Sequence, residues 1–108
     1  MNFLFASTFI LSAFAANENS IVLYHGYITK IRCEGKLLIS AIGDPNLVAL
    51  EALPPQVGCG VLVKPLTKIG RTNLALETST GSSSLLIEVI AAPAHLDSSR
   101  LDVKVRAV

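Results

Sequence analysis

The sequence predicts an all-β fold: a small β-sandwich of about seven short strands, preceded by a cleavable signal peptide. Short segments rich in Val, Ile, Leu and Thr recur along the chain, and most of them alternate apolar and polar side chains as half-buried strands do. Turn sequences that contain Gly, Pro or Ser separate these segments. No internal repeat and no second domain is visible in the sequence.

The N-terminal stretch MNFLFASTFILSAFA has the pattern of a secretory signal peptide. Its apolar run extends from Phe3 to Phe14, and Ala13-Phe14-Ala15 matches an A-x-A cleavage site, although no Lys or Arg precedes the run. The alternatives are a buried helix and a membrane anchor, but the run is shorter than the roughly 20 residues that span a bilayer. We therefore expect residues 1–15 to be removed, residues 16–108 to form one domain, and no membrane span in the mature chain.

Seven strands are expected, at residues 21–24, 27–33, 37–42, 61–64, 72–78, 85–90 and 101–105. Residues 37–42 are a continuous apolar run, which suits a strand buried on both faces. Alternation places Leu74 and Leu76 on the inner face of their strand. The sequence STGSSS at residues 79–84 indicates a flexible hairpin loop.

Residues 46–53 are compatible with two local structures. Asp44 and Pro45 are good residues for the start of a short helix, whereas the spacing of Val48 and Leu50 fits an irregular strand. We expect about one helical turn followed by extended chain, and Pro54-Pro55 excludes helix beyond that point.

Composition limits the partners and the covalent structure. The formal net charge is +1, and the basic residues Lys64, Lys68 and Arg71 have no aromatic residues between them, so nucleic acid is not an expected partner. Cys33 and Cys59 are the only cysteines, and in an oxidising compartment they are the candidate pair for a disulfide. The alternative is two buried free thiols.

The sequence contains few groups that could do chemistry. His95 lies near Asp97, Ser98 and Ser99, but catalytic triads are defined by geometry and not by neighbours in the sequence, so a solvated polar loop is the simpler interpretation. The cysteines and histidines lack the spacing of metal ligands. We therefore predict that the protein is not an enzyme and has no catalytic residues, metal site or cofactor.

Four short motifs follow one another along the chain. The first is G-Y-x-T-x-I, with Gly26, Tyr27, Thr29 and Ile31, and the second is Gly43-Asp44-Pro45. The third is V-K-P, with Lys64 and Pro65. The last is T-N-L-x-L-x-T, with Thr72, Asn73, Leu74 and Thr78. This series resembles the N-terminal domain of the periplasmic core-complex protein of type IV secretion and conjugation machines, the conjugal transfer protein family. The similarity covers residues 21–89.

The resemblance implies a β-sandwich that works as a structural periplasmic subunit on the outer-membrane side of an envelope-spanning complex. Its partners would be other subunits of the secretion channel, in a homo-oligomeric ring, and the motif residues would shape the scaffold. The chain also departs from the family pattern. Residues 1–108 lack the second β-domain of longer members, an aromatic residue is absent after both the G-D-P and T-N-L motifs, and the cysteine pair is not part of the pattern.

A second resemblance leaves the function open. Residues 41–49 and 70–74 are similar in part to the N-terminal domain of pilus-assembly secretins, which also implies a ring-forming periplasmic module. Val63-Lys64-Pro65 and Thr72-Asn73-Leu74 favour the conjugation family. A free exported binding or inhibitor domain is a further alternative, and an enzyme that uses His95 is the third class of function.

Overall fold

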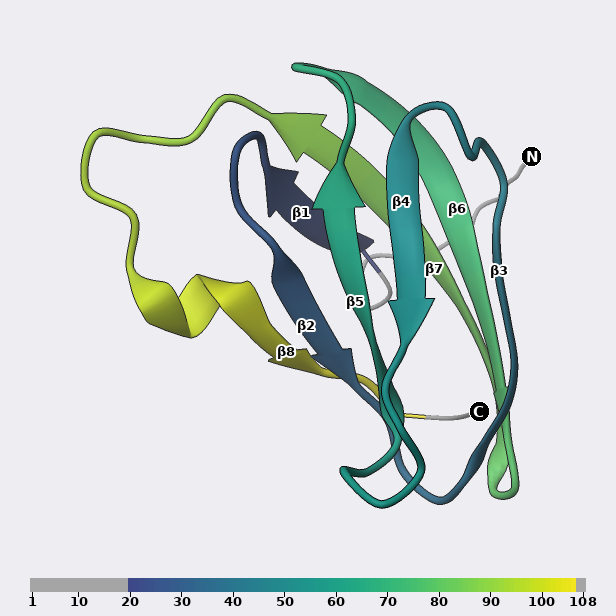
Figure 1. Cartoon of the computed structure of the whole chain (residues 1–108). Coiled ribbons are helices and arrows are strands. Elements are labelled where there is room, and N and C mark those ends of the chain that lie inside the picture. The colour runs from purple at the N-terminus through teal and green to yellow at the C-terminus, as the bar shows by residue number, and fades with distance from the viewer. Residues whose placement is uncertain (1–19, 107–108) are drawn as a thin grey trace, which may run out of the picture.

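Two four-stranded β-sheets pack face to face in the computed structural model, which describes residues 20–106 (Figure 1). The predicted all-β sandwich is therefore confirmed, with eight strands where about seven were expected. The predicted signal peptide, residues 1–15, lies outside the described residues. The strands are β1 (Ser20–Tyr24), β2 (Thr29–Arg32), β3 (Leu37–Ile42), β4 (Val48–Ala52), β5 (Gly60–Pro65), β6 (Gly70–Thr78), β7 (Gly81–Ile90) and β8 (Asp102–Lys104).

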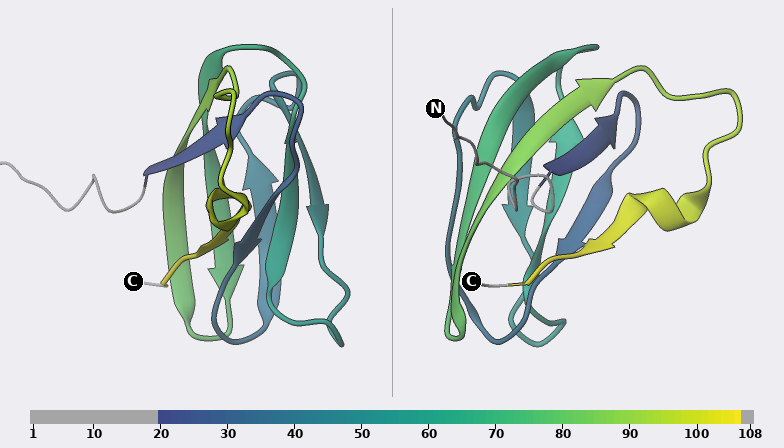
Figure 2. Two further views of the ribbon diagram at one scale, coloured as in Figure 1. Left: turned by 90° about the vertical axis from the view of Figure 1, so that its left-hand side faces the viewer. Right: turned by 180° about the vertical axis from the view of Figure 1, so that it is seen from behind.

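The first sheet has the order β1-β7-β6-β3, and the second has the order β4-β5-β2-β8. Most neighbouring strands are antiparallel, but β1 pairs with β7 and β8 pairs with β2 in parallel. The left view of Figure 2 shows the two layers edge-on. The connection from β7 to β8 passes outside the sandwich beside β1 and β2, and it contains the short 3-10 helix η3 (Ser98–Leu101).

The core lies between the sheets and consists of aliphatic side chains. Leu74 and Leu76 of β6 point into it, as the alternating pattern predicted. The residues on either side of them, Asn73, Ala75 and Glu77, are exposed or half-buried. The same holds for β7. The fully buried core side chains are Leu23, Ile31, Val48, Val61, Val63, Leu74, Leu76, Leu85, Ile87 and Val89.

Two sequence-based expectations about the first sheet were wrong. The apolar run of β3 was expected to be buried on both faces, but β3 is an edge strand, and none of its six residues is buried. The stretch at residues 79–84 was expected to be a hairpin loop, but only Ser79 and Thr80 form the turn, and β7 already begins at Gly81. In this strand Ser83 is buried and donates a hydrogen bond to the carbonyl of Arg106 at 2.9 Å.

The chain crosses from the first sheet to the second through one turn, closed by a hydrogen bond from the Leu47 amide to the Asp44 carbonyl (3.1 Å). Extended chain follows at once, as expected, and it forms β4 on the edge of the second sheet. This crossover places the edge strands β3 and β4 on the same side of the sandwich (Figure 1).

Candidate interaction surface on the open side of the sandwich

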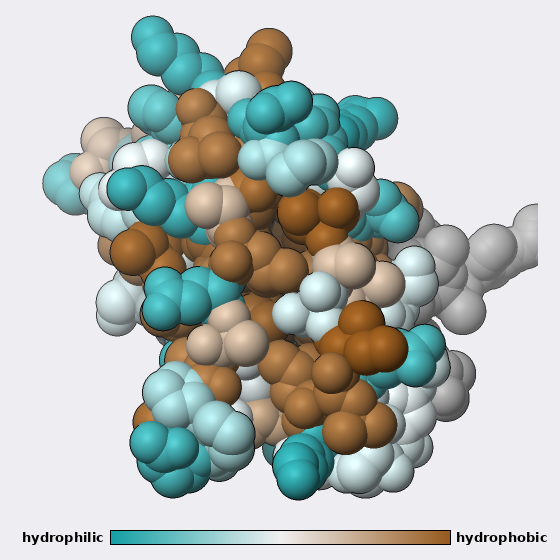
Figure 3. All heavy atoms as spheres, turned by 45° about the vertical axis from the view of Figure 1, so that its right-hand side comes forward, coloured by the Kyte–Doolittle hydropathy of each residue, from teal (hydrophilic) through white to brown (hydrophobic). Residues whose placement is uncertain are grey.

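The side of the sandwich between β3 and β4 is open and apolar. A groove of about 480 Å³ lies between the β3 edge and the chain that runs from Ala52 to Cys59. Figure 3 looks toward this side and shows a band of hydrophobic residues between hydrophilic margins. The side chains that line the groove are mainly those of Leu37, Leu38, Leu53 and Pro55, with Lys36 and Ser40 as the polar members.

The β3 strand at the border of this groove, with the sequence LLISAI, is unusual for the edge of a sheet. It contains no charged residue and no Pro, which are two common features that prevent edge strands from pairing with other chains. Leu38 is 61% exposed and Ile39 is 57% exposed. A register shift between Leu37 and Ile39 is the one protective irregularity.

The hydrogen-bonding pattern shows which main-chain groups of β3 are free to pair with another strand. The Gly43 amide donates to the Asn73 carbonyl at 2.8 Å, so this pair is of the hydrogen-bonded kind in the ladder between β3 and β6. Hydrogen-bonded and non-bonded pairs alternate in an antiparallel ladder. The main-chain amides and carbonyls of Ser40 and Ile42 therefore point away from β6, toward the free edge.

The predicted disulfide between Cys33 and Cys59 is present and borders the groove. It joins the chain just after β2 to the chain just before β5, with the two Cα atoms 5.1 Å apart. The Cys33 amide also donates to the Cys59 carbonyl at 3.0 Å, which continues the pairing of the two strands. The covalent bond therefore fixes the end of the second sheet that supports the groove.

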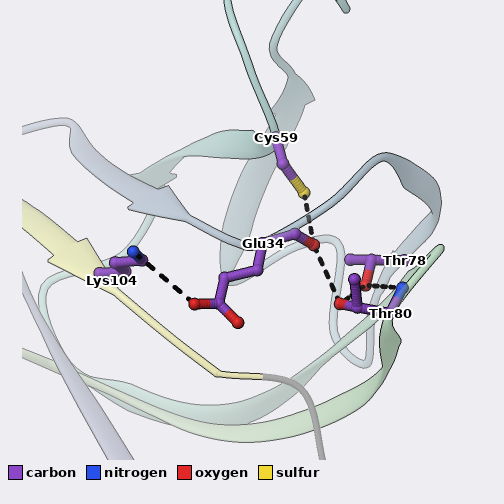
Figure 4. Close-up of polar contacts among 5 residues, drawn as sticks. All are labelled: Glu34, Cys59, Thr78, Thr80 and Lys104. Carbon is purple, nitrogen blue, oxygen red and sulfur yellow. Dashed lines mark hydrogen bonds and ion pairs between the residues drawn. The ribbon is translucent and has the colours of Figure 1, made fainter.

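Glu34 connects three parts of the chain at the same end of the molecule (Figure 4). Its carbonyl accepts a hydrogen bond of 3.2 Å from the Thr80 hydroxyl in the hairpin between β6 and β7. The same carbonyl lies 3.7 Å from the Cys59 sulfur, which is a contact and not a hydrogen bond because a disulfide sulfur carries no hydrogen. The Glu34 carboxylate lies 3.8 Å from the Lys104 ammonium, a half-exposed pair that contributes little to stability.

At the opposite end of β3, the structure brings two of the four sequence motifs into direct contact. The Asp44 amide donates to the Thr72 hydroxyl at 2.8 Å, beside the bond between Gly43 and Asn73. A side chain at Gly43 would collide with the side chains of Asn73 and Thr72, so a larger residue there would have to displace them. The G-D-P and T-N-L segments thus form one junction between β3 and β6.

The other two motifs lie on adjacent strands of the second sheet. Lys64 and Pro65 pair with the first residues of β4, and Thr29 pairs with Val63 immediately before them. Thr29 and Ile31 are fully buried, whereas Tyr27 is 42% exposed. The remaining motif residues are structural: Gly26 has a φ of 93° in the turn after β1, Leu74 is in the core, and Thr78 is buried at the hairpin.

The His95 loop does not show the geometry of a nucleophilic site. The Asp97 carboxylate caps η3 by accepting a hydrogen bond from the Ser99 amide at 3.0 Å. This bond and a further one from the Ser99 side chain lower the pKa of Asp97 below its usual 3.8. Among residues 20–106 no hydrogen bond joins His95 to Asp97, Ser98 or Ser99, and no cluster of His, Cys, Asp or Glu has the arrangement of a metal site.

Comparison of the chain with models of known protein families gave no match, and comparison with curated protein sequences gave none either. Within the described residues, no helix is long and apolar enough to cross a membrane.

The exposed β3 edge is the most distinctive surface feature, and it was not predicted from the sequence. An apolar run indicates a strand but not its place in a sheet, because that place depends on pairing with residues far away in the chain. The best available indication was the turn chemistry of Gly43-Asp44-Pro45, where the chain leaves the first sheet directly after β3.

Proposed function

We propose that the protein is a structural subunit of an envelope-spanning complex of the type IV secretion or conjugation kind. It acts by binding other protein subunits, in a ring on the periplasmic, outer-membrane side of the envelope. The observation that carries this proposal is the uncharged, exposed β3 strand beside the apolar groove. Free main-chain groups and apolar side chains together suit the addition of a strand from another protein chain.

Two further observations support the proposal. The four motifs that resemble the conjugal transfer protein family lie in two pairs, one at the β3–β6 junction of the first sheet and one on the neighbouring strands β2 and β5 of the second sheet. The disulfide between Cys33 and Cys59 suits an oxidising compartment such as the periplasm.

Co-purification from the cell envelope tests the proposal. A tag placed after Val108 allows the gently solubilised protein to be isolated together with whatever co-migrates at high mass. We expect other subunits of a secretion channel in that fraction. Recovery of pilus-assembly proteins would favour the secretin-type alternative, and recovery as a small isolated protein would favour a free exported binding or inhibitor domain and overturn the proposal.

A matched pair of variants shows whether the β3 edge makes the contact. Ile39 on β3 and Leu86 on β7 are both aliphatic, both in strands of the same sheet, and both 57% exposed. We expect Ile39→Lys to remove the co-migrating subunits and Leu86→Lys to retain them. Equal losses in the two variants would place the contact elsewhere.

A further inference from the structure

We infer that β3 binds β3 of a second copy of this chain, in antiparallel orientation, with the two Ser40 residues opposite each other at a two-fold axis. This inference rests on the proposed function only in using the β3 edge as the contact surface, and it names the partner of that edge. It gives a closed dimer that joins the first sheets of two copies into one continuous sheet.

The main-chain groups of β3 have the correct direction for this pairing. Because the hydrogen-bonded pair at Gly43 and Asn73 sets the alternation, the amide and carbonyl of Ser40 face the open edge. In an antiparallel dimer with Ser40 on the axis, each Ser40 amide donates to the Ser40 carbonyl of the other copy. The amide and carbonyl of Ile42 also face the open edge, and in this register they lie opposite Leu38 of the other copy, the residue at the register shift of β3.

The charges at the two ends of the strand favour the second copy over other occupants. Lys36 precedes Ser40 by four residues, and Asp44 follows it by four residues, with only uncharged residues between them. Antiparallel pairing about Ser40 therefore brings Lys36 of each copy to the Asp44 end of the other. Within residues 20–106, both side chains are exposed and neither forms an ion pair, so both are free to make these contacts.

The irregularity in β3 is compatible with this register. The shift lies between Leu37 and Ile39, so the segment from Ile39 to Ile42 that surrounds Ser40 is regular. The register shift moves Lys36 by one residue relative to Asp44 of the other copy. The long, flexible lysine side chain can still reach that carboxylate. Leu38 and Ile39, both exposed in the single copy, lie close to the axis and become partly covered.

Sedimentation equilibrium of the full chain, purified with its disulfide intact, tests this inference. We expect a reversible dimer. Lys36→Glu and Asp44→Lys each place two like-charge contacts at the interface, and each should raise the dimer Kd by about tenfold. An equimolar mixture of the two variants restores both opposite-charge contacts in the heterodimer, so its Kd should return to near the original value.

A second pair of variants tests the main-chain pairing without changing any charge. Ser40→Pro removes the amide that faces the free edge and leaves the hydrogen bonds to β6 in place, whereas Ser40→Ala keeps that amide. We expect Ser40→Pro to be monomeric and Ser40→Ala to remain a dimer. These outcomes do not depend on whether Asp44→Lys folds well.

Two results would overturn the inference: a full chain that is monomeric at every concentration, or a dimer that is insensitive to Lys36→Glu, Asp44→Lys and Ser40→Pro. The outcome can be separated from that of the proposed function. A monomer in solution that still co-purifies with channel subunits would reject the β3 pairing alone. A dimer of the expected kind that brings no channel subunits from the envelope would reject the secretion complex alone.

Discussion

The main-chain amide of Asp44 donates a 2.8 Å hydrogen bond to the hydroxyl of Thr72, and this bond ties the end of β3 to the early part of β6. The adjacent bond from the Gly43 amide to the Asn73 carbonyl reinforces the same junction. Here the chain leaves the first sheet and crosses to the second, so the junction determines where β3 ends and where β4 begins. It also places Asp44 at one end of the free edge.

The hydroxyl of Thr72 is expected to contribute to stability through this bond. Thr72→Val keeps the shape of the side chain but removes the acceptor for the Asp44 amide, and it should lower the free energy of unfolding by about 1 kcal/mol. Thr72→Ser keeps the hydroxyl and should cost less. Urea unfolding of both variants checks the prediction, which fails if Val and Ser at this position are equally stable.

The disulfide between Cys33 and Cys59 is expected to be a large contributor to stability, because the domain is small and, among residues 20–106, Tyr24 is the only large aromatic residue in the core. The cysteines are 26 residues apart in the sequence. In the chain-entropy model, closing a loop of this size stabilises the fold by about 3 kcal/mol.

Replacing both cysteines, as Cys33→Ala with Cys59→Ala, should therefore shift the urea midpoint strongly downward. Reductant should shift the midpoint of the original chain in the same direction and leave that of the double variant unchanged. If reductant has no effect on the original chain, the bond does not stabilise the fold in solution.

Much of the fold could be predicted because its central strands carry their own pattern. In the middle of β6 and β7 every second residue is an aliphatic side chain that points inward. The predicted inner residues Leu74 and Leu76 are buried, and so are Leu85, Ile87 and Val89 of β7. The disulfide partners were also predictable, since two cysteines in the sequence allow only one intramolecular pair.

The edge strand and the hairpin could not be predicted in the same way. The run LLISAI has the composition of a central strand, and only the strand order, which depends on distant pairings, places it at an edge. Likewise, the serines of STGSSS favour a loop by local propensity, but pairing with β6 extends β7 back to Gly81. The candidate surface was missed because it is made of these long-range relationships.

Asp97 is expected to make stability depend weakly on pH. The hydrogen bonds from Ser99 lower its pKa below 3.8 in the folded chain, so the ionised carboxylate stabilises the fold at pH values above its unfolded pKa. This contribution is lost as the pH falls through the lower, folded pKa. The effect is small because the carboxylate is exposed to solvent.

The variant Asp97→Asn keeps an acceptor for the Ser99 amide but does not titrate. The original chain should therefore be slightly more stable than the variant near neutral pH, and the difference should disappear below the folded pKa of Asp97. A carboxyl NMR titration measures that pKa directly. A value at or above 3.8 would contradict the cap geometry seen in the structure.

Thr29 and Thr78 are both buried, yet their hydroxyl groups have different surroundings. Within the described part of the chain, the Thr29 hydroxyl has no hydrogen-bond partner. The Thr78 hydroxyl accepts from the Thr80 amide at 3.2 Å and donates to the Gly81 carbonyl at 3.2 Å. Burying a polar group without a partner is unfavourable, whereas a satisfied one is stabilising.

The same substitution should therefore have opposite effects at these two positions. Thr29→Val removes an unsatisfied hydroxyl and keeps the side-chain shape, so it should raise the free energy of unfolding by about 1 kcal/mol, and Thr78→Val should lower it by about the same amount. Thermal and urea unfolding of the two variants, measured side by side, check the sign of each change. A loss of stability in Thr29→Val would show that its hydroxyl is hydrogen-bonded in solution, to water or to residues outside 20–106, because the change of shape is otherwise the same in both variants.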